Sequence, residues 1–191
     1  GFDPVDNITS NFGMSHSRWS VEYQWVTQGD FNGDGRTDLL LQGADDTRST
    51  FLLIANDTGG FNSKVNITDS YGMSSSRWSG QTQRIIPGDF NGDGNTDLLL
   101  QGADDTRSTF LLIANGNNGF NNKINITDNY NMASIRWSAE HQHIIPGDFN
   151  GDGNTDLLLQ GKTATRYTFL LIANGNNGFN NRVNITTQYG M

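Results

Sequence analysis

The chain has 191 residues, of which 34% are apolar and 23 are glycine, and it has no cysteine and a formal net charge of -8. This composition allows a buried core but excludes disulfide bonds, and without a basic patch no binding to nucleic acid is expected. No stretch approaches the ~18 apolar residues of a membrane helix, so we expect no membrane insertion. The first residues carry no recognisable signal peptide.

The sequence repeats with a period of 59 residues over its whole length. The pair Gly1-Phe2, for example, recurs at residues 60–61, 119–120 and 178–179. A period that fills the chain is typical of repeat proteins, in which each unit packs on its neighbours. We therefore divide the chain into a partial repeat at residues 1–14, a copy of an outer strand, and three full repeats at 15–73, 74–132 and 133–191.

Each full repeat predicts four strands, which in the second copy cover residues 83–86, 97–101, 108–114 and 123–127. The second and third strands are apolar without alternation, which indicates burial on both faces, whereas the fourth alternates like a half-exposed outer strand. No helix is predicted. We predict an all-β fold, a β-propeller built from four-stranded antiparallel blades. The period is too long for one coil of a β-helix.

A nine-residue loop joins the first two strands, and it recurs at residues 30–38, 89–97 and 148–156. Side-chain oxygens occupy loop positions 1, 3, 5 and 9, and position 7 offers its backbone carbonyl. Ca²⁺ prefers six to eight oxygen ligands, and alternate residues of a tight loop can point inward together. The candidate Ca²⁺ ligands are Asp30, Asn32, Asp34, Arg36, Asp38, Asp89, Asn91, Asp93, Asn95, Asp97, Asp148, Asn150, Asp152, Asn154 and Asp156.

The alternative for these loops is a solvated turn, because Asn-Gly and Asp-Gly pairs are strong turn signals. Three copies that each keep every aspartate favour the cation, since clustered carboxylates repel one another. An EF-hand is excluded because Leu41 stands at the twelfth position in place of glutamate. Nine of the 20 acidic residues lie in the loops, so three bound Ca²⁺ ions would change the net charge from -8 to -2.

The loop Asp-Phe-Asn-Gly-Asp-Gly-x-Thr-Asp followed by Leu-Leu-Leu resembles the FG-GAP (VCBS) repeats of integrin α-subunit propellers. With residues 71–79 and 110–116 included, the repeat is similar to the Psathyrella velutina lectin-like family over all 191 residues. The resemblance implies a seven-bladed propeller that binds Ca²⁺ in its loops and N-acetylglucosamine or related simple sugars between adjacent blades. This chain departs from the family in having three repeats.

Recurring polar and aromatic residues indicate where a sugar would bind on this background. Sugar sites combine an aromatic face with planar hydrogen-bonding groups. Each tryptophan is equally compatible with a wedge between blades, and each arginine with a hydrogen bond to a neighbouring blade. Gln24, Gln83 and Gln142 recur as well. The candidate carbohydrate-binding residues are Arg18, Trp19, Gln42, Arg48, Arg77, Trp78, Gln101, Arg107, Arg136, Trp137, Gln160 and Arg166.

The expected function is that of a carbohydrate-binding lectin, and the alternative is a non-catalytic scaffold or adhesion repeat stabilised by Ca²⁺. An enzyme is not expected, because the recurring carboxylates belong to the cation loops and no Ser-His-Asp or Cys-His set is visible. His141 and His143 share one strand face but lack an evident third ligand, which disfavours a transition metal. The loops and the resemblance imply an extracellular or cell-surface location.

Three repeats are fewer than the four to eight blades of a closed propeller. Two apolar blade faces would stay open, and an exposed patch of that size is an association site. We therefore expect a homo-oligomer, and favour a homodimer that closes a six-bladed ring with twofold symmetry. A piece cut from a longer, seven-bladed parent would carry the same repeated ends.

Overall fold

A computed structural model describes residues 19–62 and 64–188, which form three four-stranded antiparallel sheets. Blade 1 contains β1 (Gln24–Gly29), β2 (Asp38–Gly43), β3 (Phe51–Leu53) and β4 (Val65–Asn66). Blade 2 contains β5 (Gln83–Gly88), β6 (Asp97–Gly102), β7 (Phe110–Leu112) and β8 (Ile124–Asn125). Blade 3 contains β9 (Gln142–Gly147), β10 (Asp156–Gly161), β11 (Phe169–Leu171) and β12 (Val183–Asn184).

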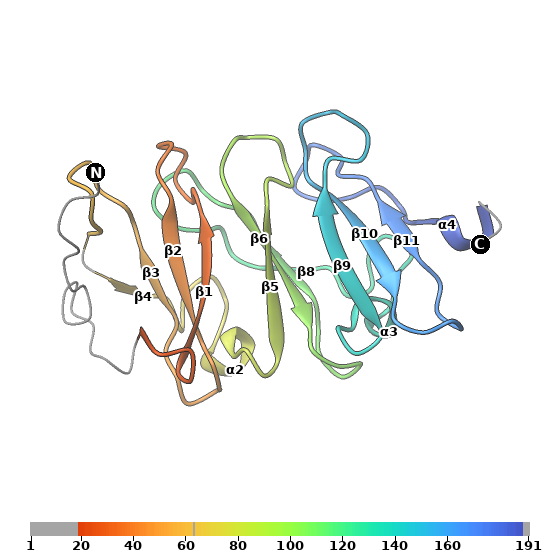
Figure 1. Cartoon of the computed structure of the whole chain (residues 1–191), viewed down its shortest axis with the longest axis horizontal. Helices are drawn as coiled ribbons and strands as arrows, with labels where there is room; N and C mark the ends of the chain where they lie inside the picture. The colour runs from red at the N-terminus through yellow and green to blue at the C-terminus, as the bar shows by residue number, and fades with distance from the viewer. Residues whose placement is uncertain (1–18, 63, 189–191) are drawn as a thin grey trace, which may run out of the picture.

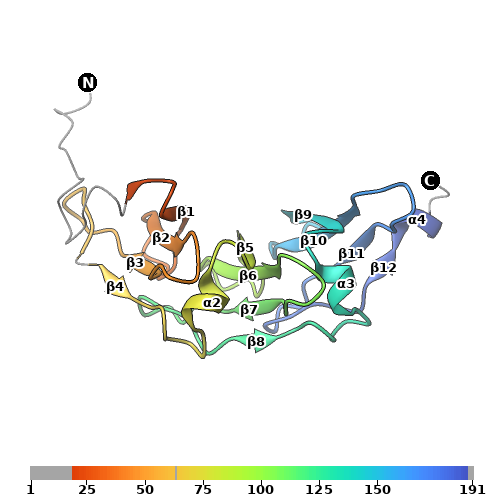
Figure 2. The ribbon, with the colours of Figure 1, turned by 90° about the horizontal axis from the view of Figure 1, so that it is seen from below.

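The strands of each blade pair in chain order, so every blade is a meander of consecutive hairpins (Figure 1). Figure 2 shows the three blades side by side along an arc, with β1, β5 and β9 on its inner side and β4, β8 and β12 on its outer side. The predicted all-β propeller architecture is confirmed, and the three blades form an open segment of a ring.

The leucines of the second strand show how one blade packs on two neighbours. In β6, Leu98 and Leu100 join the cluster shared with blade 1, whereas Leu99 joins the cluster shared with blade 3. Successive side chains of a strand point to opposite faces, so an unbroken apolar run serves both junctions. All three leucines are fully buried, as the lack of alternation predicts.

The outer strands are shorter in the structure than the sequence predicts. The third strand of blade 2 ends at Leu112, because the chain then forms an isolated bridge between Ala114 and Phe120. The fourth strand keeps two residues, Ile124 and Asn125, and both are exposed. The first two strands, in contrast, run two residues and one residue beyond the predicted ends, to Gly88 and Gly102.

The prediction of no helix is wrong for three single turns: α2 (Ser75–Trp78), α3 (Ser134–Trp137) and α4 (Ile185–Gln188). Four residues are too few to produce the apolar periodicity by which a helix is recognised in a sequence. The turns α2 and α3 lie in the connections between blades and bury Trp78 and Trp137. In the described part of the chain, no helix has the length and apolar character needed to cross a membrane.

Candidate ion loops and ligand pockets

Each predicted ion loop is folded around the carboxylate of its first aspartate. In the first loop, Asp30 Oδ1 accepts a hydrogen bond from the backbone N–H of Gly33 (2.7 Å), and Oδ2 accepts one from Gly35 (2.7 Å). The φ angles of these glycines are 76° and 80°, a region that residues with a Cβ rarely adopt. Asp89 and Asp148 accept the equivalent bonds in the other two loops.

The last aspartate of each loop is buried and attaches the loop to the sheet. Asp97 accepts hydrogen bonds from the backbone N–H groups of Phe90 (3.0 Å) and Ala114 (2.8 Å). Burial raises the pKa of Asp97 to about 7, and the charges of Asp93 and Asp89 add to this, although the two hydrogen bonds oppose it. The carboxylates of one loop therefore lie close enough to disfavour each other's charge.

The donor set of each loop fits a hard divalent cation. Burial raises the pKa of Asp38 as well, with a further contribution from the charges of Asp34 and Asp30, and a cation among these groups would offset that cost. An ionised carboxylate has about four lone-pair sites, so an oxygen that accepts one N–H can still bind a metal. The side chains of loop positions 1, 3, 5 and 9 and the carbonyl of position 7 would hold the ion.

The first loop differs from the other two at position 7. Arg36 Nη2 lies 2.6 Å from Asp34 Oδ2, so a guanidinium is paired with one of the predicted ligands. Asn95 and Asn154 stand at this position in the second and third loops. A cation that enters the first loop therefore has to compete with an intramolecular ion pair.

Adjacent ion loops are joined across the blade junctions. The Asp30 N–H donates to Thr96 Oγ1 (3.1 Å), and the Thr96 N–H donates back to the Asp30 carbonyl (2.6 Å). Asp89 and Thr155 make the same pair of bonds between blades 2 and 3. The loops are therefore part of the packing between blades.

The predicted arginines of blades 2 and 3 line two pockets, one in each blade. The first has a volume of about 250 Å³, and its lining includes Arg77, Gln83 and Arg107. The second has a volume of about 220 Å³, and its lining includes Arg136, Gln142 and Arg166. The two sets are 59 residues apart in sequence, so the pockets are one site present in two repeats, and each is lined by residues of a single repeat.

Aromatic rings position the arginines at the pockets. The guanidinium of Arg77 lies 5.1 Å from the centre of the Phe110 ring, and that of Arg136 lies 5.2 Å from Phe169. Arg182 also lies over Phe169, at 4.6 Å, and burial together with the Arg136 charge lowers the pKa of Arg182. Of these groups, Arg77 and Arg136 line the pockets, where each guanidinium is a planar hydrogen-bond donor.

Gln83 and Gln142 are pocket residues that the predicted sugar-binding set did not include. Both are buried, and their Nε2 groups donate to the carbonyls of Ser108 (3.0 Å) and Tyr167 (3.4 Å). Their Oε1 atoms have no hydrogen-bond partner among the described residues. Recurrence at the start of the first strand was the signal that could have placed them in the set.

The structure places the predicted tryptophans of blades 2 and 3 in the packing between blades. Trp78 and Trp137 are each 0% exposed, and Trp78 Nε1 donates to the Ile67 carbonyl of blade 1 (3.2 Å). Gln42 Nε2 donates to the carbonyls of Trp78 (2.7 Å) and Gln83 (3.0 Å). Gln101 makes the equivalent bonds to blade 3. These four predicted residues hold the junctions and do not line the two pockets.

The other predicted residues that the structure describes line neither pocket. Arg48 lies over the Tyr23 ring at 4.0 Å and pairs with Asp45 at 3.5 Å. Trp19 packs against the apolar cluster of blade 1. Gln160 is exposed at the free side of blade 3. Arg18 lies outside the described residues.

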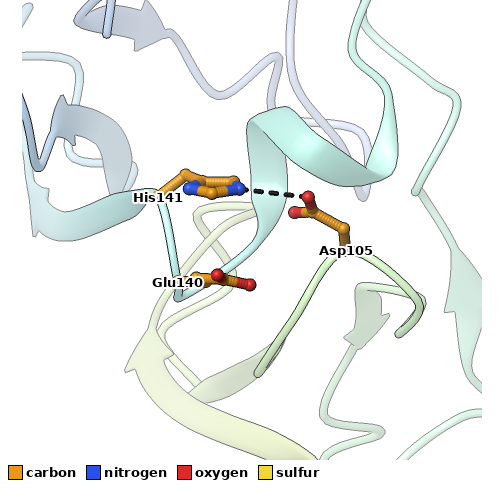
Figure 3. A group of neighbouring side chains, drawn as sticks. All are labelled: Asp105, Glu140 and His141. Carbon is orange, nitrogen blue, oxygen red and sulfur yellow. Dashed lines mark hydrogen bonds and ion pairs between the residues drawn. The ribbon is translucent and has the colours of Figure 1, made fainter. Parts of the chain in front are cut away.

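Figure 3 shows a polar group between blades 2 and 3, formed by Asp105, Glu140 and His141. His141 Nε2 lies 3.0 Å from Asp105 Oδ2 and 3.3 Å from Arg166 Nη2. The ligand atoms of the three residues lie within 4.8 Å of one another, but a guanidinium at the same imidazole nitrogen disfavours a metal there. The group links the blades beside the second pocket.

A family model described as FG-GAP-like repeat matches residues 30–100 and 89–159. The two matches begin at the first aspartates of the first and second ion loops. They run through the strands that follow and end in β6 and β10. No curated protein matches the chain by sequence.

Two solved structures share the fold. One is a lectin of Agrocybe aegerita solved for its specific recognition of non-reducing terminal N-acetylglucosamine, with 19% identity, a TM-score of 0.69, and coverage of 96% of this chain and 44% of the lectin. The other is the Tc holotoxin pore of Photorhabdus luminescens, with 19% identity, a TM-score of 0.54, and coverage of 83% of this chain and 7% of the toxin chain. The chain thus spans less than half of the length of either protein.

Proposed function

The chain belongs to the FG-GAP-like repeat family, and on this basis we propose that it is a carbohydrate-binding lectin of the β-propeller type. The observation that carries the proposal is the recurrence of one pocket, with two arginines and a buried glutamine, at equivalent positions of blades 2 and 3. Packing alone does not require two arginine side chains to line an open cavity in both the second and the third repeat.

The chemistry of the pockets suits a sugar. A guanidinium fork donates to hydroxyl or carbonyl oxygens in a fixed plane. The cavities of about 250 and 220 Å³ are smaller than the roughly 300–1,000 Å³ of drug-sized ligand sites, a size that suits a single sugar ring. In the second pocket Tyr167 adds an aromatic ring that is 48% exposed, which could cover the C–H face of a sugar. The recognition of terminal N-acetylglucosamine by the Agrocybe aegerita lectin makes this class of glycan the first to test.

Ca²⁺ is part of the proposal. The ion would supply positive charge among the carboxylates of each loop, and it would be held by the aspartates, the asparagine and the backbone carbonyl named above. Because the first and second loops are hydrogen-bonded to the next blade, ordering these loops would stabilise the two internal junctions. On the basis of the ion loops and the resemblance to lectins, we propose an extracellular or cell-surface location.

The second candidate function is a scaffold or adhesion repeat without sugar binding. It is favoured by the placement of Trp78, Trp137, Gln42 and Gln101 in the junctions, because these residues then serve packing. Neither candidate assigns a catalytic step to the chain, and both accommodate a homo-oligomer.

A glycan array that includes N-acetylglucosamine, followed by titration calorimetry, distinguishes the two. A variant with Arg77→Ala, Arg107→Ala, Arg136→Ala and Arg166→Ala should lose binding while it keeps the unfolding temperature of the parent to within a few degrees. Arg84→Ala is the matched control, since this exposed arginine of β5 lies outside the pocket linings. A folded parent that binds no glycan, or a fourfold variant that binds as well as the parent, rejects the lectin and leaves the scaffold.

A further inference from the structure

The two internal junctions are built from the same set of hydrogen bonds. A glutamine of the second strand donates to two carbonyls of the next blade, as Gln42 and Gln101 do. The Gly80 N–H donates to the Gly43 carbonyl (2.8 Å), and the Ala139 N–H donates to the Gly102 carbonyl (2.7 Å). The ion loops add the aspartate and threonine pair described above. The contacts of the internal junctions therefore predict which groups a further junction, at the free side of blade 3, would need.

Blade 3 presents these groups on its free side. Gln160, the counterpart of Gln42 and Gln101, is exposed. The Asp148 backbone, the counterpart of Asp30 and Asp89, makes no bond to a threonine among the described residues. The Gly161 carbonyl stands where the Gly43 and Gly102 carbonyls accept from the next blade. The polar half of a junction is thus repeated without a partner within residues 19–62 and 64–188.

The apolar half is repeated on the same face. Phe31 and Phe90 are 0% exposed in their junctions, whereas Phe149, at the same position of the third repeat, is 47% exposed. Leu158 and Leu170 are partly exposed as well, although their counterparts in blades 1 and 2 are fully buried. We call Phe149, Leu158, Gln160 and Leu170 the free face of blade 3.

Blade 1 carries the groups that would pair with the free face of blade 3. By the 59-residue period, the acceptors for Gln160 would be the carbonyls of Trp19 and Gln24, and the donor to Gly161 would be the Val21 N–H. Thr37 matches Thr96 and Thr155, yet it is exposed where they are partly buried. Leu41, Phe51 and Leu53 match the side chains that blade 2 presents to blade 1. Leu41, Phe51 and Leu53 are already buried in the single chain, so a docking blade has to replace the contacts that bury them.

We propose that the free face of blade 3 binds blade 1 of a second copy of this chain, and that two such head-to-tail contacts close a ring with twofold symmetry. A head-to-tail contact forms a ring when its rotation closes. Six blades lie within the four to eight of known propellers, and nine, from three copies, lie outside. We choose a second copy as the binding partner because blade 1 of the same sequence carries each partner that the free face of blade 3 lacks.

Charge supports this occupant. In the internal junctions, the side chain of Asn95 or Asn154 lies against the glycine at position 4 of the preceding ion loop, Gly33 or Gly92. Arg36 takes that position in blade 1. Docking would therefore bring its guanidinium to the third loop of the other copy, next to the aspartates of that loop.

Light scattering on a sizing column tests the association. The expected mass is twice the 21.0 kDa of one chain, and Phe149→Glu should shift it to one chain, because the charge would enter an apolar junction. Ile124→Glu is the matched control, since Ile124 is a 38% exposed apolar residue of blade 2, and it should stay at the mass of the parent. A parent chain with the mass of one copy overturns the proposal.

Disulfide trapping tests the contact itself, and the chain has no native cysteine to interfere. A Cβ built at Gly88 would lie 3.0 Å from Thr155 Cβ across the internal junction, so a small separation of the two segments would bring the pair to the roughly 3.5–4.5 Å of bridged cysteines. The double variant Gly147→Cys, Thr37→Cys should therefore give a covalent dimer on oxidation. Gly88→Cys, Thr155→Cys is the control and should form an intramolecular bridge. If the control oxidises and the first variant stays monomeric, or forms a ladder of larger species, the ring is rejected.

Discussion

Asp89 and Thr155 belong to different blades and exchange two hydrogen bonds, one from the Asp89 N–H to Thr155 Oγ1 (3.1 Å) and one from the Thr155 N–H to the Asp89 carbonyl (2.6 Å). Asp89 is also the first predicted ligand of an ion loop, and the Thr155 side chain packs beside Gly88. The proposed ion site and the blade packing therefore share one backbone segment, and a change in either is expected to affect the other.

The first prediction concerns the hydroxyl of Thr155. Thr155→Val should lower the free energy of unfolding by about 1 kcal/mol, because the Asp89 N–H loses its acceptor while the side-chain shape is kept. Chemical denaturation measures the change. Thr155→Ser is the control that keeps the oxygen, and it should cost less than Thr155→Val. Equal losses for the two variants would show that the methyl contact, and not the hydrogen bond, supports the junction.

The second prediction concerns Ca²⁺. The chain should bind three ions, and a chelator should lower the unfolding temperature, since a ligand that binds the folded state stabilises it by mass action. Asp34→Ala should leave two ions, as measured by calorimetry or metal analysis. Asp45→Ala, at a turn outside the loops, should leave three. An unfolding temperature that neither chelator nor added Ca²⁺ changes would remove the proposed ions.

The first ion loop should bind Ca²⁺ more weakly than the other two. Arg36 is paired with Asp34, and this ion pair must be broken when the carboxylate binds a metal. An exposed pair of this kind is weak, so Arg36→Asn should tighten the weakest site by about fivefold at most. A titration with the variant and the parent checks this, and an unchanged weakest site would contradict it.

The metal-free protein should become less stable as the pH rises from about 4 to about 7. The folded-state pKa of Asp97 is raised from 3.8 to about 7, so in this range the folded chain holds a proton that the unfolded chain has released, and folding weakens with rising pH. Denaturation in chelator at several pH values measures the slope. Asp97→Asn should remove this part of the slope, whereas the same slope in both proteins would assign it to other groups.

The last prediction concerns Trp78. Trp78→Ala should cost about 3–5 kcal/mol of stability, because a fully buried aromatic side chain leaves a cavity. Trp78→Phe should cost less and, where the protein is folded, should bind the proposed glycan like the parent. A Trp78→Phe protein that stays folded but loses glycan binding would show that the indole contacts the ligand.

Burial and loop position could be predicted where they depend only on the local sequence. Leu98, Leu99 and Leu100 form an unbroken apolar run, so burial on both faces, and with it the blade, is readable from the chain. The position of the loops could be predicted from the alternation of Asp and Asn, because all the candidate ligands lie within nine residues, whereas Ca²⁺ binding stays a prediction. Both inferences need only short-range geometry, which the period of the sequence repeats three times.

The location of the pockets could not be predicted in the same way. Trp78 and Arg77 are adjacent in sequence, yet one is buried in the junction and the other is exposed at the pocket. Stacking on a sugar and wedging between blades require the same large aromatic residue, so residue type does not distinguish them. Gln83 recurs with Gln24 and Gln142, which marks the position, but recurrence alone does not place the side chain in a pocket. Its place there depends on how α2 and the turn before β7 approach β5.

The order of strands within each blade also has a consequence for how the chain folds. Every strand pairs with its neighbour in sequence, so each sheet forms through short loops, and such local contacts form quickly. The blades carry nearly the same sequence, so a finished blade can dock on the wrong repeat, or on a repeat of another molecule, almost as well as on its own neighbour. Newly made chains at high concentration should therefore be prone to exchange blades, a characteristic failure of repeat proteins. The departures from strict repetition at the junctions, such as Arg36 and Val21, are positions where the correct order can be selected.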